Sequence, residues 1–207
     1  MRPEFLQAMQ DMCHQHEALF VLDEVQTGVG LTGSAWACQQ LGLEPDLVAF
    51  AKKAQVGGVM AGRRLDDVSD NVFELSGRIN STWGGGLVDM VRSRRLLEII
   101  ETDRLIAAAA ETGGWFVKEL QSLQDRHPAL MSNARGRGLM CAFDLPNPET
   151  RERVVQAMRQ GERVLILPCG ERSIRFRPAL CVSPEELQFG LEALDRCLAR
   201  LAPAEAS

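Results

Sequence analysis

Two short apolar runs, each followed at once by charged residues, organise the first quarter of the chain. Residues 18–22 are apolar and stop at the acidic pair 23–24, and residues 47–51 are apolar and stop at the lysine pair 52–53. A short apolar run that ends on a charge is typical of a buried strand in a parallel sheet, whose carboxyl end presents polar groups to a site. If the two strands are neighbours, a carboxylate and a lysine amine lie at the same edge of one sheet.

The segment between the two runs predicts a helical connection. After a glycine-rich turn, we expect Ser34 to cap a short helix over residues 36–41 and Gly42 to end it. Glu44-Pro45-Asp46 then restarts extended chain, because the residue before a proline avoids the helical region. A strand, a helix and a second strand joined by short loops form a crossover unit, which supports a parallel pairing of the two strands.

The remaining pattern predicts two domains, 1–101 and 102–207, because the character of the chain changes near residue 102. In the first, we expect a glycine-bearing strand over 55–60 and, after a loop at 77–86, a helix with apolar positions between 87 and 100. In the second, we expect helices over 104–123 and 147–158 and after a capping box at 183–186, with strands over 139–143, 164–167 and 174–176. The expected fold class is α/β, with part of a parallel-sheet domain followed by a small α+β domain.

Composition narrows the function classes. The chain has 207 residues, 45% of them hydrophobic, a net charge of −5 and a pI near 5.3, so there is no electrostatic reason to expect nucleic acid or an anionic membrane as a partner. Neither a membrane span nor a signal peptide is expected from the apolar runs. The six cysteines form no C-x-x-C pair, which favours reduced thiols in a cytoplasmic protein.

Other kinds of site fit the sequence less well. An apolar strand ending in Asp-Glu also occurs in P-loop ATPases, but the chain has no G-x-x-x-x-G-K-[ST] motif. Gly28, Gly30 and Gly33 spell G-x-G-x-x-G, yet the acidic pair and Gln26 separate these glycines from the strand, which argues against a dinucleotide site. A metal site at Cys13-His14-Gln15-His16 is not expected, because these neighbours do not share a helix face. No metal is therefore predicted.

The acid and the amine at one sheet edge have a specific chemical use. A lysine can hold an aldehyde cofactor as a Schiff base, while an aspartate keeps the pyridine nitrogen of that cofactor protonated. Spacing alone leaves the alternative of a solvated lysine pair after an ordinary strand.

Several separate blocks of sequence resemble one enzyme family. The blocks are LDEVQTGVGLTG, EPDLVAFAKKAQVGG, NSTWGGGLVDMVRSRR, RGRGLMCAFDLP and IRFRPALCVS. In this order they resemble class III aminotransferases of the ornithine and 4-aminobutyrate type, which are pyridoxal-phosphate enzymes of the aspartate-aminotransferase fold type I. Within the family, KKAQVGGVMAGRR and STWGGGLVDM are most similar to the L-lysine 6-aminotransferases. The resemblance implies that 1–101 is the C-terminal part of the cofactor-binding large domain and 102–207 is the small domain.

The resemblance also implies roles for individual residues. Lys52 would be the Schiff-base lysine and proton shuttle, Asp23 the partner of the pyridinium nitrogen, and Gln26 a contact of the ring hydroxyl. Thr82 would contribute to the phosphate site of a partner subunit, which implies a homodimer with shared sites; from spacing alone it could equally be a helix cap. Arg175 would bind a substrate carboxylate through its planar guanidinium, although exposed strand arginines are common.

The implied reaction transfers the 6-amino group of L-lysine to 2-oxoglutarate, giving the 6-semialdehyde and glutamate; ornithine and 4-aminobutyrate are the alternative donors. The family's first half, with its phosphate loop and ring-stacking aromatic, has no counterpart in this chain. The chain therefore resembles the C-terminal half of such an enzyme. A second hypothesis is that it is a non-catalytic remnant or an assembly module, since half a parallel sheet leaves an unpaired strand edge and uncovered apolar surface.

Overall fold

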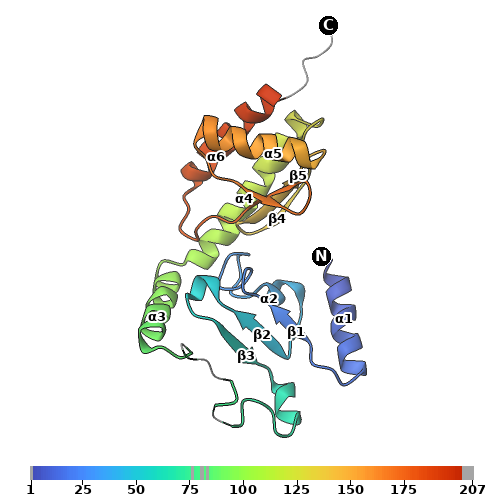
Figure 1. Cartoon of the computed structure of the whole chain (residues 1–207), viewed down its shortest axis with the longest axis vertical. Helices are drawn as coiled ribbons and strands as arrows, with labels where there is room; N and C mark the ends of the chain where they lie inside the picture. Colours follow the sequence, from blue (N-terminus) through green and yellow to red (C-terminus); the bar gives the residue numbers. More distant parts are fainter. Residues whose placement is uncertain (1, 76, 80–81, 83, 202–207) are drawn as a thin grey trace. The chain divides into compact units, whose positions relative to one another are not determined.

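The computed structural model describes residues 2–75, 77–79, 82 and 84–201. The chain divides into two compact units (Figure 1). Unit 1 comprises residues 1–30 and 34–104, and unit 2 comprises residues 31–33 and 105–207.

Unit 1 is built on a three-stranded sheet of order β1-β2-β3, in which β1 and β2 are parallel and β3 is antiparallel to β2. The expected parallel pairing of the first two strands is confirmed. The strand expected over 55–60 is shorter and starts later, at Gly58. The elements of unit 1 are α1 (Pro3–Gln15), β1 (Val21–Asp23), α2 (Ala37–Leu41), β2 (Leu47–Phe50), η1 (Lys52–Ala54), β3 (Gly58–Ala61), η2 (Arg63–Asp67) and α3 (Leu87–Thr102).

A small apolar cluster and the ion pair between Asp46 and Arg64 hold the loops around β1 and β2. Phe20, Cys38 and Leu43 form the buried centre of the cluster. Close by, the carboxylate of Asp46 is 3% exposed; it accepts a hydrogen bond from the Phe20 N–H at 2.7 Å and pairs with Arg64 at 2.7 Å. Both partners satisfy a carboxylate that would be costly to bury alone.

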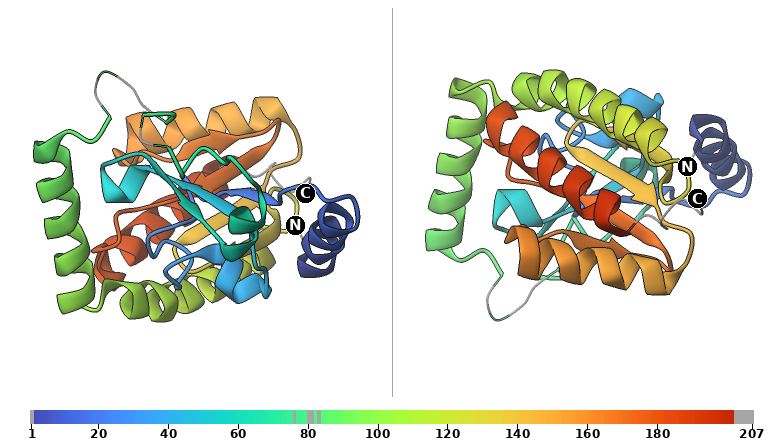
Figure 2. Two further views of the ribbon diagram at one scale, coloured as in Figure 1. Left: turned by 90° about the horizontal axis from the view of Figure 1, so that it is seen from below. Right: turned by 90° about the horizontal axis from the view of Figure 1, so that it is seen from above.

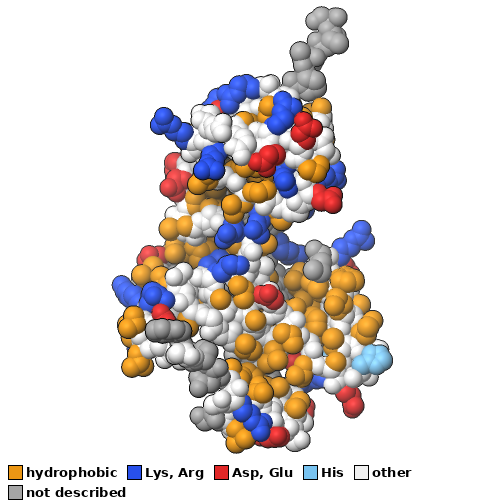
Figure 3. All heavy atoms as spheres, viewed as in Figure 1, with side chains coloured by type: hydrophobic (Ala, Val, Ile, Leu, Met, Phe, Trp, Pro, Cys, Tyr) orange, Lys and Arg blue, Asp and Glu red, His pale blue; other side chains and the backbone are white. Residues whose placement is uncertain are grey.

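Much apolar surface of unit 1 is exposed. Figure 3 shows hydrophobic side chains gathered over α1 and over β1–β3. On α3, the side chains of Leu87, Val88 and Val91 are 82%, 78% and 70% exposed, and β1 is an edge strand of the described sheet. The expectation of an unpaired strand edge and uncovered apolar surface is therefore confirmed for the described residues.

Unit 2 is an antiparallel sheet of order β4-β5-β7-β6 covered by helices. Viewed from above, α4, α6 and α5 lie side by side across the sheet (Figure 2). Its elements are α4 (Leu105–Arg126), β4 (Ser132–Arg137), β5 (Met140–Asp144), α5 (Pro148–Ala157), a π-helical turn η3 (Met158–Glu162), β6 (Leu167–Cys169), β7 (Ser173–Phe176) and α6 (Pro184–Leu201).

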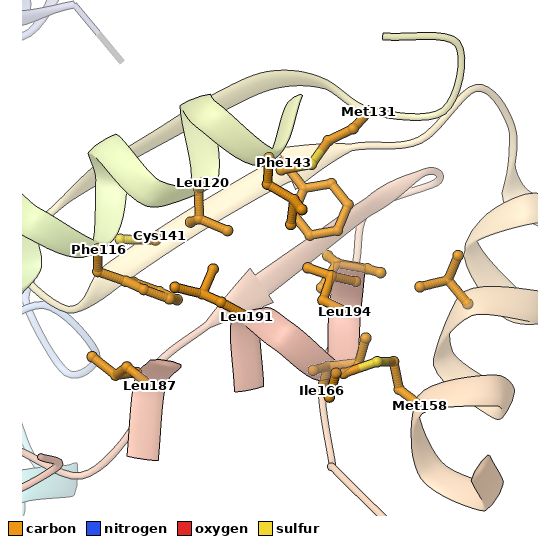
Figure 4. Close-up of a cluster of buried hydrophobic side chains, with 14 of the residues drawn as sticks. Phe116, Leu120, Met131, Cys141, Phe143, Met158, Ile166, Leu187, Leu191 and Leu194 are labelled. Carbon is orange, nitrogen blue, oxygen red and sulfur yellow. The ribbon is translucent and has the colours of Figure 1, made fainter. Parts of the chain in front are cut away.

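The core of unit 2 is formed by facing side chains from the helices and the central strands. Figure 4 shows Phe116 and Leu120 of α4 opposite Leu191 and Leu194 of α6, with Phe143 of β5 completing the cluster. Each of these residues except Leu191 is at most 2% exposed. The expected capping box of the last helix is present, since the Ser183 N–H donates to Glu186 at 2.9 Å and the Glu186 N–H to the Ser183 hydroxyl at 3.2 Å.

Asp144 links three segments of this sheet. Its buried carboxylate accepts hydrogen bonds from Ser173 Oγ at 2.6 Å, Asn133 Nδ2 at 2.8 Å and Arg135 Nη1 at 3.0 Å. Burial opposes ionisation, but the three donors and the charge of Arg135 outweigh it and lower the pKa of Asp144. Arg135 therefore has a structural role in this sheet.

Two strand predictions in unit 2 need correction. β4 was not predicted, because SNARGR has no apolar alternation; it is held by its pairing with β5 and by the Asp144 contacts. The strand expected over 164–167 is wrong: β6 starts at Leu167, and in the preceding loop Ile166 is buried whereas Leu165 is 79% exposed. Among the described residues, no helix has the length and apolar character needed to cross a bilayer.

Candidate functional site

The carboxyl ends of β1 and β2 bring an acid and a lysine to one sheet edge. In the parallel register Asp23 is the partner of Ala49. The ladder continues one step further, because the Glu24 N–H donates to the Ala49 carbonyl at 2.9 Å. Lys52 follows directly, as the first residue of η1. Asp23 and Lys52 thus leave neighbouring strands at the same edge, and both side chains are exposed.

The two adjacent acids have different surroundings. Asp23 is exposed, and its Oδ1 accepts a hydrogen bond from the Val25 N–H at 2.9 Å, which closes a short turn. Glu24 is 3% exposed. Successive residues of a strand point to opposite faces, so only one of the two acids can face the open side. Asp23 is the acid whose side chain faces solvent, and the side chain of Glu24 is buried.

The carboxylate of Glu24 serves a structural role at the start of α2. It accepts hydrogen bonds at 2.8 Å from the N–H groups of Ala37 and Cys38 and from the hydroxyl of Thr27. The predicted cap by Ser34 is therefore wrong: the Ser34 hydroxyl instead donates to the Trp36 carbonyl at 2.7 Å. The helix does end at Gly42 in a left-handed conformation, as expected.

The same contacts argue against the dinucleotide interpretation of the glycines. A bound phosphate needs free N–H groups at a helix start, but those of Ala37 and Cys38 already donate to Glu24. Gly28 is needed for packing, since a Cβ there would overlap the ring of Trp36. Burial, together with the charge and the hydrogen bond of Glu24, raises the pKa of the Cys38 thiol to about 11, which makes that thiol a poor nucleophile.

The two adjacent lysines also differ. Lys52 is exposed, whereas Lys53 is half-buried and donates from Nζ to the backbone carbonyl of Gln26 at 2.6 Å. The backbone after Lys52 is held by Gln55, whose N–H and Nε2 both donate to the Lys52 carbonyl, at 3.2 and 3.0 Å. Arg92 of α3 in turn donates to the Gln55 carbonyl at 2.9 Å. The exposed amine therefore stands on a well-fixed turn.

Two further predicted site residues of unit 1 lie at different places. Gln26 is half-buried in the turn after β1, next to the Asp23 edge. Thr82 is exposed in the turn that precedes α3. The helix cap is Gly86, so the alternative of Thr82 as a helix cap is wrong.

Arg175 belongs to unit 2. It lies on β7, in register with Ala142 of β5 and Leu167 of β6, and its side chain is half-buried. It lines a hollow of about 240 Å³ whose other walls are mainly apolar and include Phe116 and Leu191. A cationic fork beside an apolar hollow suits a carboxylate on a short aliphatic chain.

In unit 1, the sequence singled out Asp23 and Lys52 but did not reveal the roles of their neighbours Glu24 and Lys53. Strand alternation could have separated Asp23 from Glu24, because only one of two successive residues faces the open side. No sequence signal predicted the contact of Lys53 with Gln26. Among the residues that the structure describes, no three His, Cys, Asp or Glu side chains are grouped as metal ligands.

The family model described as aminotransferase class-III matches residues 1–198. The L-lysine-epsilon aminotransferase of Amycolatopsis lactamdurans is 59% identical over 196 residues, which cover 95% of this chain and 44% of that protein.

Solved structures agree with these matches. The lysine aminotransferase from M. tuberculosis in its internal aldimine form has a TM-score of 0.94 at 49% identity and covers 98% of this chain and 46% of its own. The acetylornithine aminotransferase from Elizabethkingia anophelis has a TM-score of 0.82 at 25% identity and covers 95% of this chain and 49% of its own. These likenesses confirm the expected α/β fold of type I. The chain spans less than half the length of each of these proteins.

Proposed function

Because the chain belongs to the class III aminotransferase family, we propose that it carries the catalytic lysine of a pyridoxal-phosphate aminotransferase. The proposed reaction moves the 6-amino group of L-lysine to 2-oxoglutarate and gives the 6-semialdehyde and glutamate. The observation that carries the proposal is the placement of Asp23 and Lys52 at the ends of two paired parallel strands. The choice of lysine as donor rests on the relatives that are named for it.

The residues at the sheet edge fit this cofactor. A pyridine nitrogen needs an accessible carboxylate and an aldehyde needs an accessible amine, and the side chains of Asp23 and Lys52 are both exposed. Glu24 is not available for either role, because its carboxylate is bonded to the start of α2. When bound, pyridoxal phosphate supplies an electron sink for the negative charge that develops at the substrate carbon.

Each residue then has a defined role. The Asp23 carboxylate holds a proton at the pyridine nitrogen, and the Gln26 side chain contacts the ring hydroxyl. The Lys52 amine holds the cofactor and, once free, moves a proton at the reacting substrate carbon. The Thr82 hydroxyl binds phosphate across a homodimer, and the Arg175 guanidinium binds the carboxylate of the amino-acid or 2-oxo-acid substrate.

The decisive experiment locates the lysine that reacts with the cofactor. Lysine occurs at positions 52, 53 and 118 alone, so borohydride reduction of the protein mixed with pyridoxal phosphate, followed by peptide mass mapping, distinguishes an adduct at each of these three lysines from no adduct at all. We expect the reduced adduct at Lys52, its loss in Lys52→Ala and its persistence in Lys118→Ala. An adduct mainly at Lys118, or none at all, would refute the proposal.

The donor is tested separately. With 2-oxoglutarate as acceptor, glutamate formation is compared for L-lysine, ornithine and 4-aminobutyrate. A clear preference for L-lysine supports the proposed reaction. A protein that uses ornithine or 4-aminobutyrate but not L-lysine would keep the aminotransferase function and remove the donor assignment.

A second function is an assembly module that completes its site only with further polypeptide. The exposed apolar side chains of α3 and the open edge of β1 favour it, because exposed apolar patches commonly mark protein interfaces. Light scattering of the purified protein distinguishes a homodimer from a monomer that lacks its partner.

The free state of all six cysteines supports a proposed location in the cytoplasm.

A further inference from the structure

Lys53 connects the two turns that carry the candidate cofactor residues. Its Nζ donates to the carbonyl oxygen of Gln26 at 2.6 Å, and the contact is partly buried. Gln26 belongs to the turn after β1, and Lys53 belongs to η1 after β2. This hydrogen bond therefore joins the two turns at the carboxyl ends of β1 and β2, between residues 27 positions apart in the sequence.

Each of the two turns is also fixed internally. In the turn after β1, the Val25 N–H donates to Asp23 at 2.9 Å and the Gly28 N–H donates to the Glu24 carbonyl at 2.9 Å. In η1, the Ala54 N–H donates to the Ala51 carbonyl at 2.9 Å. These bonds hold each turn but do not join one to the other; the ammonium of Lys53 does.

We propose that Lys53 is a positioning residue that holds the Asp23 turn and the Lys52 turn at one spacing. The inference rests on the proposed function for its catalytic meaning, because the two turns carry the acid and the amine of that site. A lysine suits this role, because its ammonium is a compact point donor on a flexible stem that can reach a backbone carbonyl. It also explains why the neighbouring lysines divide their roles, with Lys52 left exposed.

Hydrogen exchange of the free protein tests the positioning role without the cofactor. Lys53→Met keeps an unbranched side chain but removes the donor. Because Lys53→Met removes a charge-assisted hydrogen bond, we expect the Val25 and Gly28 amides to exchange at least about 10-fold faster, which corresponds to about 1.4 kcal/mol. Lys53→Arg, which keeps a cationic donor, should restore slow exchange, and Lys118→Met should leave both amides unchanged. Unchanged exchange in Lys53→Met would overturn the inference.

A second measurement links the spacing to the cofactor site. With pyridoxal phosphate present, we expect Lys53→Met to lower the borohydride-trapped fraction at Lys52 by at least about fivefold and Lys53→Arg to restore most of it, as the loss of one charge-assisted hydrogen bond predicts. Trapping at Lys53 in the unaltered protein would overturn the assignment. If no protein forms an adduct at any lysine, the proposed function fails, whereas the exchange data still decide the role of Lys53.

Discussion

Replacing Glu24 removes the carboxylate on which the start of α2 depends. Glu24→Ala leaves the N–H groups of Ala37 and Cys38 without their acceptor, in a place where the glutamate side chain is 3% exposed. A buried donor that loses its partner costs about 1–3 kcal/mol, so the two together cost about 2–6 kcal/mol. Because 1.4 kcal/mol is tenfold, the region around α2 should open at least about 30-fold more often.

Alkylation of Cys38 measures this opening directly. Cys38 is 8% exposed, and Cys197 in unit 2 is fully buried and serves as a control within the same molecule. Under conditions in which the thiol reacts only from the opened state, Glu24→Ala should raise the labelling rate of Cys38 at least about 30-fold and leave that of Cys197 unchanged. Glu44→Gln, which changes an exposed glutamate, should have no effect.

Charge is separated from hydrogen bonding by Glu24→Gln. Glu24 contributes to the raised pKa of the Cys38 thiol, so any neutral residue makes that thiol somewhat easier to ionise. The Gln amide keeps one acceptor oxygen but has an NH2 donor group where glutamate has its second acceptor oxygen. One of the two backbone N–H groups therefore loses its acceptor, and this substitution costs about 1–3 kcal/mol of local stability. We expect a labelling rate between those of the unaltered protein and the alanine variant. Equal rates in all three proteins would refute the assigned role of Glu24.

Other contacts give further predictions. Asp144→Ala should lower the free energy of unfolding of unit 2 by about 2–4 kcal/mol at pH 7, measured by urea unfolding. Because the pKa of Asp144 is lowered in the folded protein, the difference in unfolding free energy between the two proteins should be lost as the pH falls through this lowered pKa. Iodoacetamide should modify the exposed Cys181 in the folded protein but reach Cys141, whose thiol pKa burial raises to about 12, only after unfolding. Gly113→Ala should destabilise unit 2 by about 1–3 kcal/mol, because a Cβ there overlaps the backbone of the β4–β5 turn. The adjacent Gly114→Ala, with open space around it, should instead stabilise α4 by about 0.5–1 kcal/mol.

Each of these has an outcome that contradicts it. For the carboxylate, an unfolding difference that persists unchanged to about pH 2, well below the usual range of an aspartate, would mean that ionisation of Asp144 does not contribute. For the thiols, rapid labelling of Cys141 in native buffer would mean that the core of unit 2 opens easily. For the glycines, similar shifts of the urea midpoint in both variants would show that the close approach to the β4–β5 turn does not limit side-chain size at position 113.

The parts of the fold that the sequence predicts well are those whose pattern is local. The parallel pair β1 and β2 follows from two short apolar runs ended by charges, although β1 starts only at Val21, which is 55% exposed, and not at residue 18. The last helix follows from its capping box. β4 could not be predicted in this way, since its residues are mostly polar and its strand character depends on its pairing with β5.

The site shows the same limit at the level of single residues. The Asp-Glu pair suggested acids at a sheet edge, and strand alternation implies that only one of the two faces outward. The structure identifies which one, because the Glu24 carboxylate is hydrogen-bonded to the start of α2 while Asp23 stays accessible. The hydrogen bond from Lys53 to Gln26 could not be predicted from the Lys-Lys pair either. Its acceptor is a backbone carbonyl, which every residue has, so the residue type at position 26 does not indicate the contact.

The assignment of residues 31–33 to unit 2 has a practical consequence for dissecting the protein. Leu31 is 1% exposed in the core of unit 2, and its carbonyl accepts the Leu139 N–H at 2.9 Å. A polypeptide that begins at Leu105 would therefore lack the Leu31 side chain in its hydrophobic core. A cavity the size of a leucine lowers the free energy of unfolding by roughly 2–5 kcal/mol. Unit 2 expressed alone should therefore need residues 31–33, either grafted onto it or added as a peptide. During synthesis, the core of unit 2 can be completed only after both segments have been made.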